Sequence, residues 1–290
     1  MAVWGRKKQR VDTKSICRSE IETHIERLQA GHENHLAVLY SMLLSEDEGA
    51  VNIVAEAIHT YMYRLDAMNI IRLDRVFRQY TSMEWSIDWE KSSPADVTEG
   101  ITNPRMQASI LRLGTLHPNG YFREKCMKAL ADDEASYGYI ALRLNDWVRQ
   151  VRETAYRILS EKLDEAKVDT AVKMLPFISR TKKGERYGYR QFQEIEEKLA
   201  DRILLHLDEI SLENIRNYPP ATKRFLYKTL ISPAVLSRQE VQRILAREKN
   251  GNEKALVIRL ILQKYTCSDA EIDAYMQNKS PIVRQKAYRV

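Results

Sequence analysis

Residues 151–158 read Val-Arg-Glu-Thr-Ala-Tyr-Arg-Ile, and residues 283–290 repeat the phrase as Val-Arg-Gln-Lys-Ala-Tyr-Arg-Val. A looser copy, Phe-Arg-Glu-Lys-Cys-Met-Lys-Ala, occupies residues 122–129. Each copy places apolar residues at positions i, i+4 and i+7, which is the pattern of a helix with one buried face. Self-similarity at such a period indicates an array of stacked helical hairpins.

Two weaker copies begin at Thr222 and Glu253, and both have lost the first apolar position. The starts at 222, 253 and 283 are separated by about the length of one helical hairpin. A single hairpin of this size cannot bury its own apolar face, so each one has to stack on its neighbours.

The turn before the copy at residues 151–158 resembles that of a HEAT repeat, because Asp146 closes one helix and Val151-Arg152 opens the next. In that family the Asp and the Arg form a hydrogen-bonded ladder between repeats. The resemblance implies that Asp146 and Arg152 are ladder residues. Asn278 with Arg284, and His117 with Arg123, keep the same spacing of six residues with a different first member. The implied fold is all-α, a right-handed α-α superhelix (solenoid) of HEAT-like helical hairpins.

The sequence predicts three regions. Residues 1–15 are expected to be a flexible basic arm, and residues 16–100 an irregular helical segment with helices near 16–30, 33–45, 49–64 and 67–82. Residues 101–290 are expected to be HEAT-like repeats that continue from that segment. The apolar pattern of the last predicted helix is still incomplete where the sequence stops at Val290. We therefore expect a fragment of a longer array or an array without a terminal cap.

Composition and charge narrow the class of protein. The chain has 290 residues with 10 glycines and 8 prolines, which suits a helical protein, and it contains no apolar run long enough to span a membrane. Its three cysteines are far apart and form no CxxC motif, so a reducing cytoplasm is the expected location. Residues 222–290 contain 14 Lys or Arg against 6 Asp or Glu. This excess predicts either a solvated basic face or an acidic partner.

Two sets of residues are candidates for binding a partner. The first lies in a turn where cations alternate with tyrosines, as in single-stranded nucleic-acid grooves and in protein hot spots. Its members are Arg180, Lys182, Lys183, Arg186, Tyr187, Tyr189 and Arg190. The second is the pair Trp85 and Trp89, which either anchor a partner or pack the N-terminal helices onto the first repeat.

The sequence offers little evidence for a metal site or a catalytic site. His32 and His35 with Glu33 make only half of a metal site, and no further ligands complete it. The deoxyhypusine-hydroxylase type of HEAT-like enzyme has several His-Glu pairs, and this chain has one. A HEAT-like DNA glycosylase would need Asp146, Trp147 and Arg149 in catalytic roles, but the ladder already explains Asp146, and Trp147 is expected to be an apolar plug.

The sequence therefore predicts no catalytic residues, no cofactor, no metal and no small-molecule substrate. We expect a non-catalytic scaffold that binds a protein partner along the concave face of the solenoid. The alternative is a nucleic-acid-binding module that uses the basic C-terminal repeats.

Overall fold

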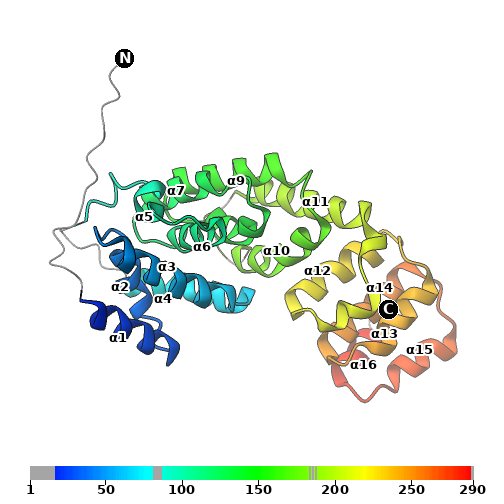
Figure 1. Cartoon of the computed structure of the whole chain (residues 1–290). Coiled ribbons are helices and arrows are strands. Elements are labelled where there is room, and N and C mark those ends of the chain that lie inside the picture. The colour runs from blue at the N-terminus through cyan, green and yellow to red at the C-terminus, as the bar shows by residue number, and fades with distance from the viewer. Residues whose placement is uncertain (1–16, 81–86, 183, 185, 187, 289–290) are drawn as a thin grey trace. The chain divides into compact units, whose positions relative to one another are not determined.

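The computed structural model describes residues 17–80, 87–182, 184, 186 and 188–288. Within these residues all regular structure is helical (Figure 1). The expected basic arm, Trp85, Lys183 and Tyr187 lie outside the described residues, and the side chain of Tyr189 does as well. None of the helices in the described part of the chain is long and apolar enough to cross a membrane.

The chain divides into two compact units. The first contains residues up to Glu165 together with Arg180–Ile195, and the second contains Ala166–Ser179 together with Glu196–Val290. Helices α10 (Val168–Thr181) and α11 (Tyr189–Leu205) each have residues in both units.

The first four helices match the expected N-terminal pattern closely. They are α1 (Arg18–Gln29), α2 (His35–Met42), α3 (Glu48–Tyr63) and α4 (Ala67–Tyr80). The side chain of Asp47 caps α3 by accepting hydrogen bonds from the N–H groups of Gly49 and Ala50. Gly31, at a φ of 94°, makes the left-handed turn that follows α1.

Five further helices lie wholly within the first unit. They are α5 (Pro94–Thr98), α6 (Pro104–Gly114), α7 (Gly120–Ala129), α8 (Tyr137–Leu142) and α9 (Arg149–Lys162), with the 3-10 turns η1 (Glu134–Ser136) and η2 (Arg143–Asn145). α5 begins at Pro94, a residue suited to the first helical position, and the Asp96 carboxylate accepts a hydrogen bond from the Ser93 N–H at 2.7 Å.

The second unit contains the 3-10 turns η3 (Leu207–Glu209) and η4 (Leu212–Asn217) and the last five helices. These are α12 (Pro220–Ile231), α13 (Arg238–Arg247), α14 (Gly251–Lys264), α15 (Asp269–Met276) and α16 (Pro281–Ala287). Ser237 and Glu240 form a capping box at α13, and Ser268 and Glu271 form another at α15. α14 packs against both α12 and α16.

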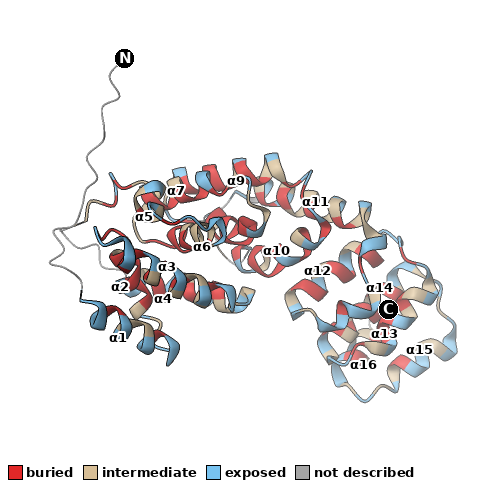
Figure 2. Ribbon diagram, in the orientation of Figure 1, coloured by how far each residue is buried: buried red, intermediate tan, exposed pale blue. Residues whose placement is uncertain are grey.

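The repeated phrase forms helices that bury most of the predicted apolar positions, although Ala129 at the end of α7 is exposed and Val290 lies outside the described residues. Phe122 and Cys126 on α7, Val151 and Ala155 on α9, and Val283 on α16 are all fully buried. Figure 2 shows the buried residues along the sides of these helices, whereas α1 is largely exposed. α7 packs beside α9 (Figure 1), so the faces predicted from the sequence meet each other.

Trp89 lies in the core of the first unit. Its side chain is 3 % exposed, and its ring centroid is 4.3 Å from that of His117 and 4.9 Å from that of Phe122. This is the packing role that the sequence left open for it. The alternative role, an exposed anchor for a partner, is wrong for Trp89 because a buried indole has no surface to offer.

Candidate functional site

The turns before α7, α9, α14 and α16 share a hydrogen bond, although their sequences differ. In each turn a polar side chain accepts the backbone N–H two residues later, at distances of 2.9–3.1 Å. The four acceptor residues are His117, Asp146, Glu248 and Asn278. An imidazole, an amide and two carboxylates are interchangeable here because each one presents an acceptor at the same place.

A guanidinium six residues after the acceptor closes three of these turns. Arg123 donates to the carbonyl oxygens of His117 and Pro118, at 2.6 and 2.7 Å. Arg152 does the same for the carbonyls of Asp146 and Trp147, and Arg284 for those of Asn278 and Lys279. The spacing of six residues therefore reflects a hydrogen bond from the arginine side chain to a main-chain carbonyl of its own turn.

The link between neighbouring turns comes from a different pairing. Arg123 donates to the Asp146 carboxylate, in the following turn, at 2.7 Å, and both side chains are fully buried. In the second unit Lys223, at the position equivalent to Arg123, pairs with Glu248 at 2.9 Å. Each cation thus fixes its own helix to the acid of the next turn.

Asp146 is the centre of a buried network of charges. Its carboxylate also accepts hydrogen bonds from Arg143 at 3.2 Å and from Arg78 at 3.3 Å, and these two arginines both pair with Asp74. Burial, and the nearby Arg78, lower the pKa of Arg123, although Asp146 opposes the shift. The Asp146 carboxylate is fully enclosed, so it has no open face for a substrate nucleotide. The glycosylase-like role considered for Asp146 does not fit this environment.

Trp147 is placed differently from the sequence expectation. It follows the buried Asp146, yet its side chain is 63 % exposed, so the expected apolar plug is wrong. The equivalent positions in two turns of the second unit are Lys249 and Lys279, and both are exposed. This position of the turn points to solvent, and at Trp147 it displays a large apolar ring.

The loop that contains the predicted cations packs against the turn of Trp147. The Arg186 N–H donates to Asn145 Oδ1 at 3.1 Å, and Thr181 donates to the Ala141 carbonyl at 3.1 Å. A Cβ on Gly184 would lie only 1.8 Å from the Asn145 amide nitrogen, so glycine is required for this close approach. The candidate residues Arg180, Lys182, Arg186 and Arg190 are all exposed. The ammonium of Lys182 also lies 5.5 Å from the Phe192 ring centroid.

A separate groove lies between α1 and α3. It has a volume of about 440 Å³. Its apolar lining includes Ile25, Leu28, Ile53, Ala57 and Leu65, and Glu56 and Arg64 contribute charges. Tyr61, also in the lining, donates a hydrogen bond to Glu33, which pairs with Arg72.

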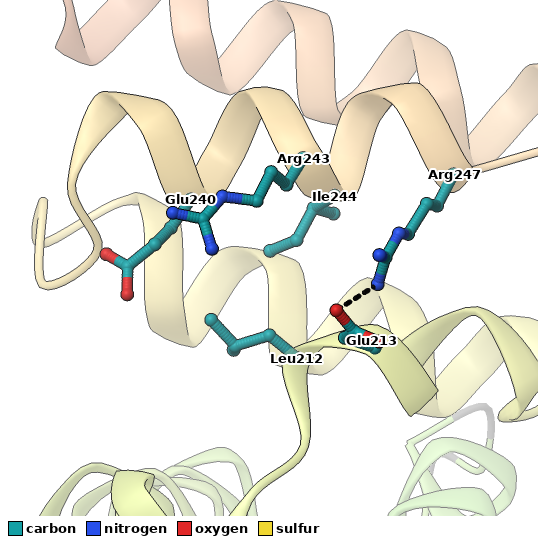
Figure 3. Close-up of a pocket in the computed structure, with 6 residues that line it drawn as sticks. All are labelled: Leu212, Glu213, Glu240, Arg243, Ile244 and Arg247. Carbon is teal, nitrogen blue, oxygen red and sulfur yellow. Dashed lines mark ion pairs between the residues drawn. The ribbon is translucent and has the colours of Figure 1, made fainter.

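A smaller pocket of about 40 Å³ lies in the second unit (Figure 3). Leu212 and Ile244 provide its apolar surface, and Arg247 pairs with Glu213 at 2.7 Å across it. Because Arg247 is already paired with Glu213 and the volume suits only a few water molecules, this pocket is a poor site for a ligand.

The histidines of the N-terminal segment form a pair that the sequence did not predict. Nδ1 of His24 lies 2.7 Å from Nδ1 of His35, whereas His32 is exposed. Burial and the neighbouring His24 and His32 lower the pKa of His35. Among the described residues, no three His, Cys, Asp or Glu side chains are grouped so that they could hold a metal ion.

Comparison with protein-family models gives no match for this chain, and no curated protein sequence is significantly similar to it.

Proposed function

We propose that this protein is a non-catalytic protein-interaction scaffold of HEAT-like hairpins stacked as a solenoid. The recurring turn supports this architecture, because an acceptor at the same position, a bond from an arginine to the main chain and an ion pair between turns recur with different side chains. A buried ion pair between successive helices fixes their register, which suits a scaffold that presents side chains at set positions. The thiols Cys17, Cys126 and Cys267 are free, in keeping with the reducing cytoplasm that we propose as the location.

The groove between α1 and α3 is the observation on which the proposed function rests. Its volume falls within the range of pockets that hold ligands or side chains of a partner. The lining is apolar at Ile25, Ile53 and Leu65 and charged at Glu56 and Arg64, which fits an amphipathic helix with its apolar face turned inward.

The test is to fill the groove. Peptides from a displayed library of amphipathic helices are selected on the protein, and their affinities are measured by fluorescence anisotropy. Ala57→Phe places a ring inside the groove and should weaken binding of the selected peptides by about tenfold or more, since one or two anchors usually dominate such contacts.

Ala246→Phe is the matched control, because Ala246 is an exposed helical alanine in the second unit. Its affinity for the peptides should stay unchanged. Equal binding by wild type and Ala57→Phe, or the absence of any helical peptide that binds, would refute docking in this groove.

A further inference from the structure

Three turns of the first unit are joined into one continuous edge. They are residues 117–119 before α7, residues 146–148 before α9, and the loop before α11. The Arg123–Asp146 pair joins the first turn to the second, and a Cβ on Gly120 would lie 3.0 Å from Val148 Cγ2. The hydrogen bond from the Arg186 N–H to Asn145 joins the second turn to the loop. Three separate parts of the sequence therefore lie side by side.

Two aromatic rings are exposed on this edge. Tyr121 follows Gly120 and is 60 % exposed, and Trp147 precedes Val148 and is 63 % exposed. Leaving such rings in water forgoes roughly 2 kcal/mol of burial free energy each. Isolated exposed apolar residues are ordinary, but here the two rings lie on adjoining segments, and each can stack on a planar ligand.

Exposed cations lie on the same segments. Arg149 begins α9 with its side chain 78 % exposed, and Arg180, Arg186 and Arg190 are exposed on the neighbouring loop and its flanking helices. Two acids belong to these segments: Glu153 pairs with Arg149, and Glu185 directly precedes Arg186 in the sequence. The edge therefore combines an excess of guanidinium groups with two aromatic rings.

The backbone at Trp147 is held by two hydrogen bonds. The Trp147 carbonyl accepts a hydrogen bond from Arg152, and the Val148 N–H donates to the buried Asp146. A base that stacks on Trp147 therefore loses little binding free energy to ordering this turn.

We propose that the edge formed by Tyr121, Trp147, Arg149, Arg180, Arg186 and Arg190 binds single-stranded nucleic acid. The two rings stack on bases while the guanidinium groups neutralise phosphates, as in single-strand binding grooves in general. A duplex keeps its bases stacked on one another and offers no face to Trp147, so single strands are preferred. An acidic polypeptide would use the cations but would gain no base stacking from the rings.

The experiment measures the anisotropy of labelled single-stranded DNA, single-stranded RNA and duplex DNA as full-length protein is added at several salt concentrations. Binding of the single strands should weaken with salt, with a slope of log K against log salt of about −2 to −3, because three or four phosphates are neutralised. Trp147→Ala should weaken binding by about tenfold or more, and Trp147→Phe should restore part of the loss because it keeps a ring. The triple variant Arg180→Ala, Arg186→Ala, Arg190→Ala should flatten the salt slope.

Two comparisons make the result specific to this edge. Lys249→Ala with Lys279→Ala removes two exposed cations at equivalent turn positions in the second unit, and its binding should equal that of wild type. Trp147 and the three arginines are exposed, so the helical circular dichroism of their variants should not change. The groove variant Ala57→Phe should bind nucleic acid normally, which separates this inference from the proposed peptide groove.

Three outcomes would overturn the inference. The first is no binding of any single strand at low salt. The second is equal loss in the Lys249/Lys279 control and in the arginine variant, which would mean that overall charge alone is responsible. The third is competition by polyglutamate as effective as that of an unlabelled oligonucleotide, which would identify the partner as an acidic polypeptide.

Discussion

Arg123 shows how a single side chain can hold this structure together. Its guanidinium is fully buried and bonds to two main-chain carbonyls and to Asp146, so one residue closes its own turn and connects it to the next. Arg149, only three residues from Asp146, is exposed and pairs with Glu153 on the surface. The sequence presents both simply as arginines near helix starts, and only burial separates their roles.

The first prediction compares these two arginines. Arg123→Met should lower the free energy of unfolding by about 3 kcal/mol, because it leaves Asp146 buried with fewer partners. Arg149→Met should change it by no more than about 0.5 kcal/mol, as expected for an exposed i, i+4 pair. Urea unfolding followed by circular dichroism checks both, and equal effects would contradict the assigned roles.

The second prediction concerns His117 and pH. Burial, with the charges of Arg123 and Arg78, lowers the pKa of His117 to about 3. The unfolded chain has an ordinary histidine pKa of about 6.5, so below that pH it binds a proton that the folded chain does not. Stability should therefore fall with pH from about 6.5 downward, by about 2 kcal/mol at pH 5 from this residue.

His117→Asn provides the comparison for that prediction. An asparagine can still accept the N–H of Asn119, as Asn278 does for Ser280. The difference in the free energy of unfolding between wild type and variant should change between pH 7 and pH 5. Only the wild type loses stability through protonation of His117 in the unfolded chain. Parallel curves over that interval would show that His117 does not contribute to the pH dependence.

At the scale of helices, the second unit uses a lysine where the first uses an arginine. Lys223 and Tyr227 of α12 both bond to Glu248, which immediately precedes the turn to α14. Burial raises the pKa of Glu248, but hydrogen bonds from Tyr227, the Asn250 N–H and Lys223 outweigh it and lower the pKa overall. Glu248 therefore stays ionised and ties one hairpin to the next.

The third prediction is a coupling between these helices. A double-mutant cycle of Lys223→Met and Glu248→Gln should give an interaction free energy of about 2 kcal/mol in urea unfolding, since the pair is buried. The exposed pair Lys173–Asp169, within one turn of α10, should give about 0.5 kcal/mol or less. A weak coupling at Lys223–Glu248 would mean that apolar packing alone joins α12 to α14.

At the scale of the whole molecule, the two units interleave along the sequence. Residues 180–195 belong to the first unit although residues 166–179 belong to the second. Thr181 bonds to Ala141, Arg186 bonds to Asn145, and Glu194 accepts a hydrogen bond from Tyr156. The first unit is therefore incomplete without a segment that follows it at some distance in the chain.

The fourth prediction tests that interleaving. A fragment of residues 1–195 should melt at a higher temperature than a fragment of residues 1–165, because the longer one retains these contacts with α8, η2 and α9. Thermal unfolding followed by circular dichroism makes the measurement. Equal melting temperatures would show that residues 180–195 add nothing to the stability of the first unit.

The sequence alone determined the helical class, the first four helices to within a few residues, and the buried faces of α7, α9 and α16. These follow from local rules, because helical periodicity and capping residues act over a few positions. The spacing of six between Asp146 and Arg152 was also visible, but not which atoms it joins.

Only the tertiary structure decided which side chains are buried and which lie together. Trp89 and Trp147 have similar polar and charged neighbours in the sequence, yet one is in the core and the other faces solvent. The pairing of Arg123 with Asp146, and of Arg186 with Asn145, spans more than twenty residues in each case. Periodicity places a residue on one face of its own helix, whereas its burial and its partners depend on which other helices pack against that face.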